Sequence, residues 1–221
     1  MEAFGLLQPS AQRLFQFCHI LHQHQPVFCQ QQIHHGLWDH DNSSASLLID
    51  TTINGQPRKL LAQPSKQGWL YVFDRITGQP IWPIPEVAVP QTNMPTEKTS
   101  PTQPIPTNPP PYSRTFIAES DLIDFTPALR AEAIEGTKAF RKGPIFTPPS
   151  LANEKDGTSG TLMLPSFTGG ANWEGGAFDP ETGMLYIGSW TNPSILALAK
   201  DARSDMDYSG GGGNISTRAK G

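Results

Sequence analysis

One short outline occurs twice in the chain and limits the folds that it can adopt. Each copy is an apolar run, an Asp-x-x-Thr-Gly turn and a second apolar run, at residues 68–82 and 176–187. This composition is typical of a tight turn, because aspartate side chains bond nearby backbone amides and glycine reaches positive φ. The copies lie about a hundred residues apart, which predicts a repeated all-β architecture with a long insertion.

The residues before the first copy predict a β-hairpin. Apolar segments at 47–50 and 59–63 flank the dipeptide Asn54-Gly55. Asn-Gly is a strong signal for a type I′ turn, because both central residues of that turn need positive φ. We therefore expect two antiparallel strands here, followed by a third at residues 68–73.

The insertion spans residues 83–149, and its two halves predict different structures. The first half is rich in proline, which lacks the amide proton that a β-ladder needs, so we expect an extended loop without a ladder of its own. The second half predicts a short helix. Its expected N-cap is Thr126, followed by Pro127 at the first helical position.

Further residues of this helix set its expected end and its buried side. Gly143-Pro144 is expected to end the helix. Leu129 and Ile134 are expected to share an inward face. The helix would then pack one side on the strands.

Both ends of the chain differ in composition from the middle. Residues 1–26 are rich in Gln and His, and we expect a poorly ordered head, although Leu14, Phe15, Cys18 and Leu21 have the spacing of one amphipathic helical stretch. Cys18 could pair with Cys29, but one pair is weak evidence for an oxidising compartment. Residues 203–221 contain a run of glycines, so we expect a flexible tail and no closing strand.

Charge and hydropathy exclude several classes of function. The chain has 16 basic and 20 acidic residues, so it offers no excess of positive charge to nucleic acid. Its longest apolar run is much shorter than a membrane span. The first 25 residues show no basic segment followed by an apolar one, so no signal peptide is visible.

Several motifs resemble, in the same order, those of the membrane-associated quinoprotein glucose dehydrogenases, which use pyrroloquinoline quinone (PQQ). The matching stretches are His34-His35-Gly36-Leu37-Trp38-Asp39, Ala62-Gln63-Pro64-Ser65-Lys66-Gln67, 71–82, Thr99-Ser100-Pro101-Thr102-Gln103-Pro104, 121–127, Ile145-Phe146-Thr147-Pro148-Pro149 and Gly169-Gly170-Ala171-Asn172-Trp173. The resemblance implies an eight-bladed β-propeller. Because 221 residues are too few for eight blades, we expect an internal fragment and an incomplete propeller.

The resemblance also divides the chain. Residues 1–26 have no counterpart in the family. The partial propeller would occupy 27–221, with blade elements and the active-site strand at 27–82, the insertion at 83–149, the next blade elements at 150–202 and the tail at 203–221.

By the same resemblance, a small set of residues carries the chemistry. Asp39 matches the catalytic base and a ligand of Ca²⁺ (or Mg²⁺), and a carboxylate suits removal of a hydroxyl proton. Lys66 matches the cofactor lysine, whose charge suits an anionic quinone oxygen. Asn172 matches a residue that contacts the quinone, with Trp173 packed beside it. His35, and with it His34, is expected to support the pocket.

Each of these residues also has an ordinary structural interpretation. Asp39 could cap a turn, Lys66 could be a surface lysine, and Trp173 could be a buried tryptophan at the start of a strand. The histidines could satisfy loop carbonyls. His40 and Asp41 follow Asp39 directly, and since neighbouring residues of a strand point to opposite faces, at most some of the three can converge.

The function implied by the resemblance is oxidation of an aldose or polyol hydroxyl by hydride transfer to PQQ. Ubiquinone would be the electron acceptor, and the periplasmic face of the inner membrane the location. The other metal ligands and the blades that cover the quinone are expected in missing upstream segments, so we expect the isolated chain to be inactive. A non-enzymatic propeller module and an inactive truncated product are the alternatives.

Overall fold

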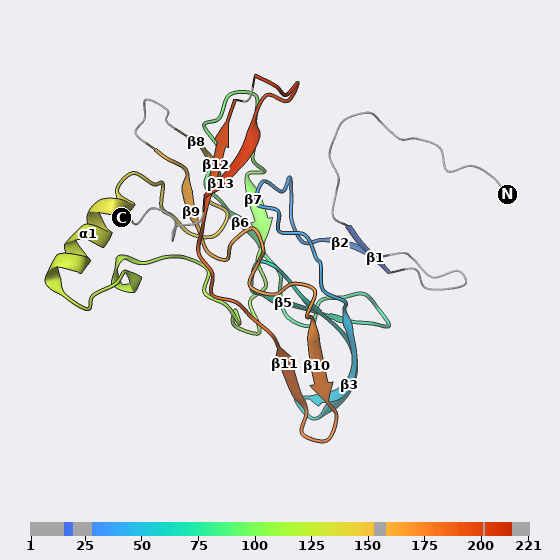
Figure 1. The fold of residues 1–221 in the computed structure, drawn as a ribbon. Helices are drawn as coiled ribbons and strands as arrows, with labels where there is room; N and C mark the ends of the chain where they lie inside the picture. The colour runs from blue at the N-terminus through green and yellow to red at the C-terminus, as the bar shows by residue number, and fades with distance from the viewer. Residues whose placement is uncertain (1–15, 20–27, 153–157, 201, 214–221) are drawn as a thin grey trace, which may run out of the picture.

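Short β-strands form most of the regular secondary structure, and long loops connect them. The computed structural model describes residues 16–19, 28–152, 158–200 and 202–213. Within these ranges the chain forms five small β-sheets and one α-helix, α1 (Pro127–Thr137), with a 3-10 turn at Glu119–Asp121. Figure 1 shows α1 at one side of the molecule and the β1–β2 pair at the other. The all-β class predicted from the sequence is confirmed.

The central sheet has three antiparallel strands in the order β3-β4-β5. They are β3 (Leu47–Ile53), β4 (Gln56–Pro64) and β5 (Leu70–Asp74). Asn54 and Gly55 have φ of 51° and 75° in the connecting turn, which confirms the predicted hairpin. The second half of β4 is buried along its whole length, because apolar clusters cover both faces of the sheet. This buried half leads directly to Lys66.

Both Asp-x-x-Thr-Gly segments form the predicted turns. Asp74 accepts hydrogen bonds from the amides of Ile76 and Thr77, both at 2.9 Å. Partial burial acts to raise the pKa of Asp74. The hydrogen bonds from these amides act in the opposite direction and are stronger together, so the pKa lies below its usual value. In the second copy the Thr182 hydroxyl and the Glu181 amide lower the pKa of Asp179. The glycine that ends each turn has positive φ.

The second copy packs against the first. Its strands β10 (Gly176–Asp179) and β11 (Met184–Ile187) form a hairpin. Phe178, Leu185 and Ile187 from this hairpin contact the apolar cluster on one face of the central sheet. Figure 1 shows the hairpin beside β3. The repeat is therefore also a packing unit.

The first half of the insertion does contain a ladder, so that expectation is wrong. Strands β6 (Glu86–Ala88) and β7 (Thr102–Pro104) pair antiparallel, with Glu86 opposite Pro104. A two-stranded ladder tolerates proline because each strand has a free edge on which no amide proton is needed. Gln103, at the centre of β7, is fully buried.

The helix begins where predicted but ends early, and none of its residues is fully buried. The Thr126 hydroxyl accepts a hydrogen bond from the Leu129 amide at 3.2 Å, which confirms the N-cap. The helix ends at Thr137 instead of continuing to Gly143. None of its residues is fully buried; Leu129 is exposed and Ile134 is half-buried, so the two do not share an inward face as expected. Within the described ranges, no helix is both long and apolar enough for a membrane span.

The C-terminal sheet overturns part of the predicted flexible tail. Strand β12 (Ser194–Ala199) pairs with β8 (Ser150–Leu151), β9 (Thr161–Met163) and β13 (Ser209–Gly213). The expectation of no closing strand is wrong for β13, because a glycine-rich strand at a sheet edge needs only its backbone to pair. Residues 214–221 lie outside the described residues.

The N-terminal head is described only in part. Strand β1 (Gln16–His19) pairs with β2 (Phe28–Gln31), so the expected helical stretch is wrong at residues 16–19. Cys18 stands opposite Cys29 in this register. The rest of the head and the side chains of both cysteines lie outside the described residues, so the cysteine pairing stays a prediction.

Gly55 tests the backbone requirement of the central hairpin. No atom lies within 4 Å of a Cβ built on Gly55, so its φ of 75° is the main obstacle to a side chain. Gly55→Ala should therefore lower the free energy of unfolding by about 1 kcal/mol in urea titrations. Gly210→Ala, in β13, is the matched control, because its Cβ is equally unobstructed and its φ is ordinary. Equal urea midpoints for the two variants would contradict this interpretation.

Candidate functional site

The segment that carries Asp39 is a loop, so the predicted active-site strand is wrong. Residues 32–46 connect β2 to β3 without strand structure. His35 and Asp39 have φ of 42° and 58°, in the left-handed region that regular strands do not use. Asparagine and aspartate tolerate this region better than most residues do. The loop can therefore turn sharply at Asp39.

Two buried neighbours fix the direction of Asp39. Trp38 is 1% exposed, donates its indole N–H to the Thr147 carbonyl at 2.8 Å and packs edge-on against Phe146. His40 is also buried, with Nε2 3.1 Å from the Ser166 carbonyl oxygen. Because Trp38 and His40 both point inward, the Asp39 side chain points out, and it is 70% exposed.

Lys66 lies under this loop, in the turn between β4 and β5. Its side chain is 8% exposed. The ammonium donates to the Asp39 carbonyl oxygen at 2.9 Å and to Asp41 Oδ1 at 2.5 Å, while Asp39 Oδ2 lies 3.7 Å away. The structure thus brings the predicted pair, Asp39 and Lys66, together. It also adds Asp41, whose contact with Lys66 the sequence did not predict.

A pair of glycines closes over Lys66 from the C-terminal part of the chain. The Gly170 amide donates to the Lys66 carbonyl at 2.8 Å. Gly169 has φ of 88°, and a Cβ on it would lie 2.5 Å from Lys66 Cγ. Position 169 therefore requires glycine, because a side chain there would be strained by the positive φ and would collide with the side chain of Lys66.

Asn172 follows these glycines, and its side chain forms hydrogen bonds with backbone groups of nearby residues. Its amide nitrogen donates to the Thr168 carbonyl at 2.8 Å, and its Oδ1 accepts from the Trp173 amide at 3.0 Å. Its carbonyl accepts from the Ser44 hydroxyl at 2.5 Å, which joins this segment to the Asp39 loop. The structure therefore places Asn172 beside the site, and its contact with a quinone stays a prediction.

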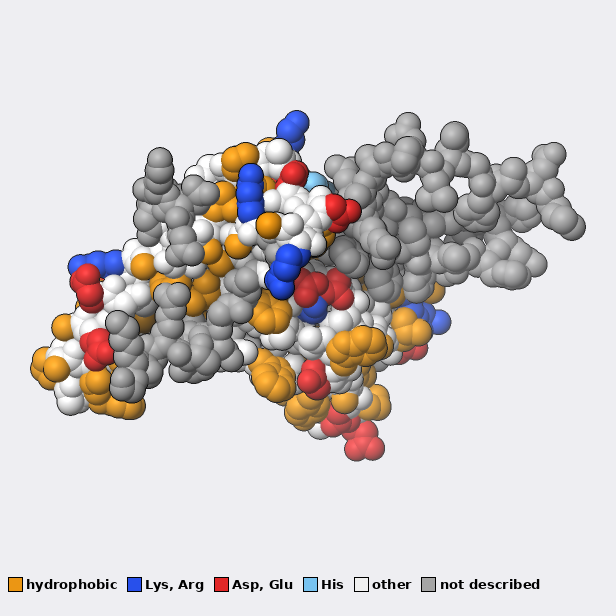
Figure 2. Space-filling model, turned by 45° about the horizontal axis from the view of Figure 1, so that its top comes forward, with side chains coloured by type: hydrophobic (Ala, Val, Ile, Leu, Met, Phe, Trp, Pro, Cys, Tyr) orange, Lys and Arg blue, Asp and Glu red, His pale blue; other side chains and the backbone are white. Residues whose placement is uncertain are grey.

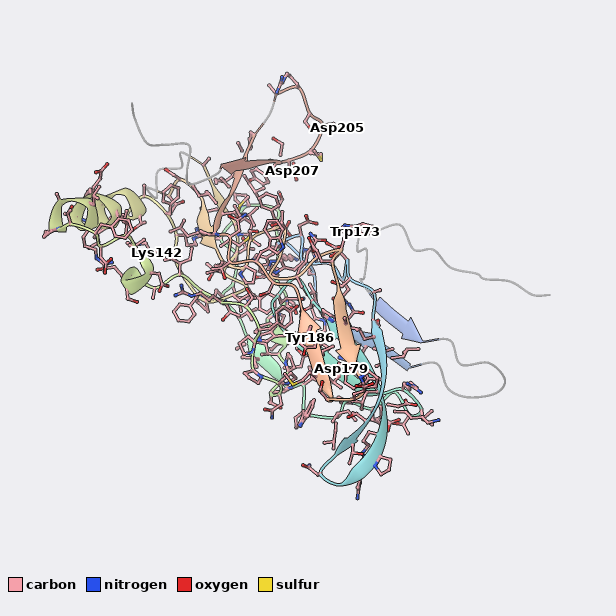
Figure 3. All side chains as sticks on the ribbon, turned by 60° about the horizontal axis from the view of Figure 1, so that its bottom comes forward. Lys142, Trp173, Asp179, Tyr186, Asp205 and Asp207 are labelled. Carbon is pink, nitrogen blue, oxygen red and sulfur yellow. The ribbon has the colours of Figure 1, made fainter. Side chains whose placement is uncertain are left out.

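Trp173 is exposed, so the alternative of a buried structural tryptophan is wrong. Its side chain is 85% exposed and lines an open hollow of about 730 Å³, between β3 and the start of β10. Figure 3 shows Trp173 at the start of the β10–β11 hairpin and Asp179 at the other end of β10. In Figure 2 hydrophobic side chains lie exposed over the part of the molecule that holds this hairpin.

His34 and His35 connect the loop to the insertion. His34 Nε2 lies 2.9 Å from Glu86, and His35 Nε2 lies 2.8 Å from Glu97. The buried amide of Gln103 bonds both the backbone N–H and the carbonyl of His34. These contacts support the loop from its insertion side, while any contact of His35 with a ligand stays a prediction.

The charges of the site fit part of a quinone and metal site. PQQ is anionic and rich in oxygen, and a buried ammonium beside an open carboxylate suits such a group. Ca²⁺ takes six to eight oxygen ligands. Asp39 would supply part of that shell, and the described residues contain no cluster of three or more His, Cys, Asp or Glu side chains that could hold a metal.

Burial of His40 gives the site loop a pH dependence. Burial lowers the pKa of His40 from 6.5 to about 4; the bond to the Ser166 carbonyl opposes this shift, and the Lys66 charge adds to it. The unfolded chain therefore binds a proton below pH 6.5 that the folded chain excludes until about pH 4. Stability from this group is complete above pH 6.5 and is lost as the pH falls.

Urea unfolding at two pH values tests this dependence. From pH 7 to pH 5 the wild-type chain should lose about 2 kcal/mol more unfolding free energy than His40→Leu, which has no titrating group at this position. An identical loss in both proteins would show that His40 is not the buried neutral group described above.

Comparison with known proteins gives one family. Residues 24–219 match the family model described as "PQQ: Glucose/ethanol/alcohol dehydrogenase, beta-propeller domain". The glycerol dehydrogenase large subunit of Gluconobacter oxydans is 32% identical over 168 residues, which are 75% of this chain and 22% of that protein. The quinoprotein glucose dehydrogenase of Escherichia coli is 34% identical over 173 residues, which are 76% of this chain and 20% of that protein.

A third relative has a different named substrate. The quinate/shikimate dehydrogenase (quinone) of Acinetobacter baylyi is 28% identical over 182 residues, which are 82% of this chain and 22% of that protein. This chain thus spans about a fifth of the length of these relatives. Its short, mostly antiparallel sheets are those of an incomplete propeller. The family model covers most of the sequence, and the chain belongs to the PQQ-dependent glucose, ethanol and alcohol dehydrogenases of the β-propeller class.

Proposed function

We propose that this chain carries the general base and the cofactor lysine of a PQQ-dependent dehydrogenase that oxidises a hydroxyl group of an aldose or polyol. One observation carries the proposal. The exposed Asp39 carboxylate lies 3.7 Å from the buried ammonium of Lys66, within a loop anchored on both sides. A base open to substrate beside a donor suited to a quinone oxygen is the pair that such a reaction needs.

Each residue of the site has a defined task in this proposal. Asp39 takes the proton of the substrate hydroxyl at a carboxylate oxygen, and Trp38 and His40 keep that carboxylate directed outward. Lys66 donates a hydrogen bond to an anionic oxygen of the cofactor. Asn172, with Trp173 beside it, borders the cofactor. His35 supports the loop through Glu97.

PQQ, when bound, supplies the quinone that accepts the hydride, and Ca²⁺ (or Mg²⁺), held in part by Asp39, polarises it as a Lewis acid. The named substrates of the relatives are glycerol, quinate or shikimate, and glucose, all of which carry several hydroxyl groups. That shared chemistry supports a sugar or polyol as substrate. We further propose ubiquinone as the electron acceptor and the periplasmic face of the inner membrane as the location.

A non-enzymatic propeller module is the second candidate. Such a module would keep the Asp-x-x-Thr-Gly turns, which serve the fold alone. It would have no reason to bury a lysine between two aspartates in an irregular loop, because burying a charge costs free energy unless it is fully paired. The buried lysine therefore favours the dehydrogenase.

The isolated chain should not turn over. At the site, the described residues supply one ammonium and two carboxylates. The chain spans about a fifth of the length of its relatives. Anaerobic titration of the 221-residue chain with PQQ and Ca²⁺ should therefore give weak binding and no reduction of an electron-accepting dye on addition of glucose. Rapid dye reduction by this chain alone would contradict the expectation.

The role of Asp39 is best tested in a complete propeller. Residues 28–202 can replace the matching segment of the E. coli quinoprotein glucose dehydrogenase, and the chimera can be assayed for dye reduction with glucose. Asp39→Asn keeps the size of the side chain but removes the base, so kcat should fall at least about 100-fold. Asp50→Asn is the matched control, because Asp50 is similarly exposed and also pairs with a cation, Arg75.

The control variant should keep the activity of the chimera. Retained turnover in Asp39→Asn, with retained PQQ binding, would rule out Asp39 as the base. Loss of turnover in both variants would show that the effect is not specific to the site.

A further inference from the structure

We propose that Asp41 is a positioning residue of this site. It holds the Lys66 ammonium by a direct hydrogen bond, and the Asp39 carboxylate consequently has no hydrogen bond to the lysine and remains open to substrate. The inference rests on the proposed function, in which Asp39 is the base. Neither the sequence nor the family resemblance assigned any task to Asp41.

The distances show which of the two aspartate side chains forms the hydrogen bond with Lys66. Lys66 Nζ lies 2.5 Å from Asp41 Oδ1, a short charge-assisted hydrogen bond, and 3.7 Å from Asp39 Oδ2, which is too long for one. The bond of Lys66 to residue 39 goes instead to the backbone carbonyl, at 2.9 Å. The lysine thus bonds the backbone of Asp39 and the side chain of Asp41.

The exposed fractions of the three side chains also indicate that Asp41 is the partner of Lys66. The side chain of Lys66 is 8% exposed, that of Asp41 28% and that of Asp39 70%. A nearly buried ammonium needs a partner charge that is itself shielded from water, because an exposed ion pair is screened and contributes little. Asp41 meets that requirement, and Asp39 does not.

The backbone explains why two carboxylates so close together take different positions. Trp38 and His40 are fixed inside, and Asp39 turns outward between them with φ of 58°. The Lys66 bond to the Asp39 carbonyl holds this turn from below. Asp41, two residues further along, returns to the side of the loop that faces Lys66.

This arrangement has a chemical consequence. A hydrogen bond from an ammonium occupies the carboxylate oxygen that would otherwise contact a substrate hydroxyl. If Asp39 were the counter-ion of Lys66, it would have to break that bond to take a proton from substrate. With Asp41 as counter-ion, Lys66 stays neutralised while Asp39 accepts the proton.

The reactivity of the Lys66 amine in the chain without cofactor tests the proposal. Trace acetylation followed by mass spectrometry gives the labelling rate of Lys66 relative to Lys138, an exposed lysine that also has an ion-pair partner. Loss of a hydrogen bond between charged groups should make Lys66 about tenfold more reactive in Asp41→Asn. Asp39→Asn should change the rate less than about twofold, because the bond to the carbonyl of residue 39 remains.

Two further measurements keep the test decisive if Asp41→Asn folds poorly. Asp41→Glu keeps the negative charge and should restore most of the protection of Lys66. In the wild-type chain, a zero-length carbodiimide reaction should join the Lys66 amine to Asp41 in preference to Asp39. Asp50→Asn, remote from this ion pair, should leave the labelling rate unchanged.

Unchanged labelling in Asp41→Asn, an equal rise in Asp39→Asn, or an amide formed mainly with Asp39 would overturn the proposal. These results are independent of turnover. Failure of the labelling test, with Asp39→Asn still inactive in the chimera, would remove the task of Asp41 and leave the proposed function standing.

Discussion

One ammonium group, that of Lys66, holds together three segments that are far apart in the sequence. It bonds the loop of Asp39 and Asp41, it sits at the end of the buried half of β4, and the backbone of Gly169 and Gly170 closes over it. A charge with 8% exposure must be paired, and the two bonds to the loop satisfy that need. The outward direction of Asp39 follows from this pairing together with the burial of its neighbours Trp38 and His40.

Local turn chemistry was predictable from the sequence. Asn54-Gly55 and the two Asp-x-x-Thr-Gly segments depend on a few adjacent residues, and the structure forms all three turns. The helix start at Thr126 was predictable for the same reason. The order of the motifs also indicated the family, which the match to residues 24–219 confirms. Each of these features is encoded within a short stretch of chain.

Features set by distant contacts were harder to predict. The β6–β7 ladder and strand β13 form where proline or glycine content argued against strands, because a pairing partner elsewhere supplies the hydrogen bonds. The helix was expected to pack inward, yet none of its residues is fully buried and Leu129 is exposed. Strand alternation allowed some of residues 39–41 to converge but did not indicate which partner Asp41 would contact. The signal for that contact was a second aspartate two residues after Asp39, close enough in the chain to reach the same lysine.

The site separates two tasks that a single carboxylate would combine, namely neutralising a buried lysine and remaining free to accept a proton. NMR of the ¹⁵N,¹³C-labelled chain tests this separation most directly, through scalar coupling across the hydrogen bond from the Lys66 amine nitrogen to a carboxylate carbon. We predict a coupling to the side-chain carbon of Asp41 and none to that of Asp39. A coupling to the carboxylate of Asp39, with none to Asp41, would contradict this account of the site.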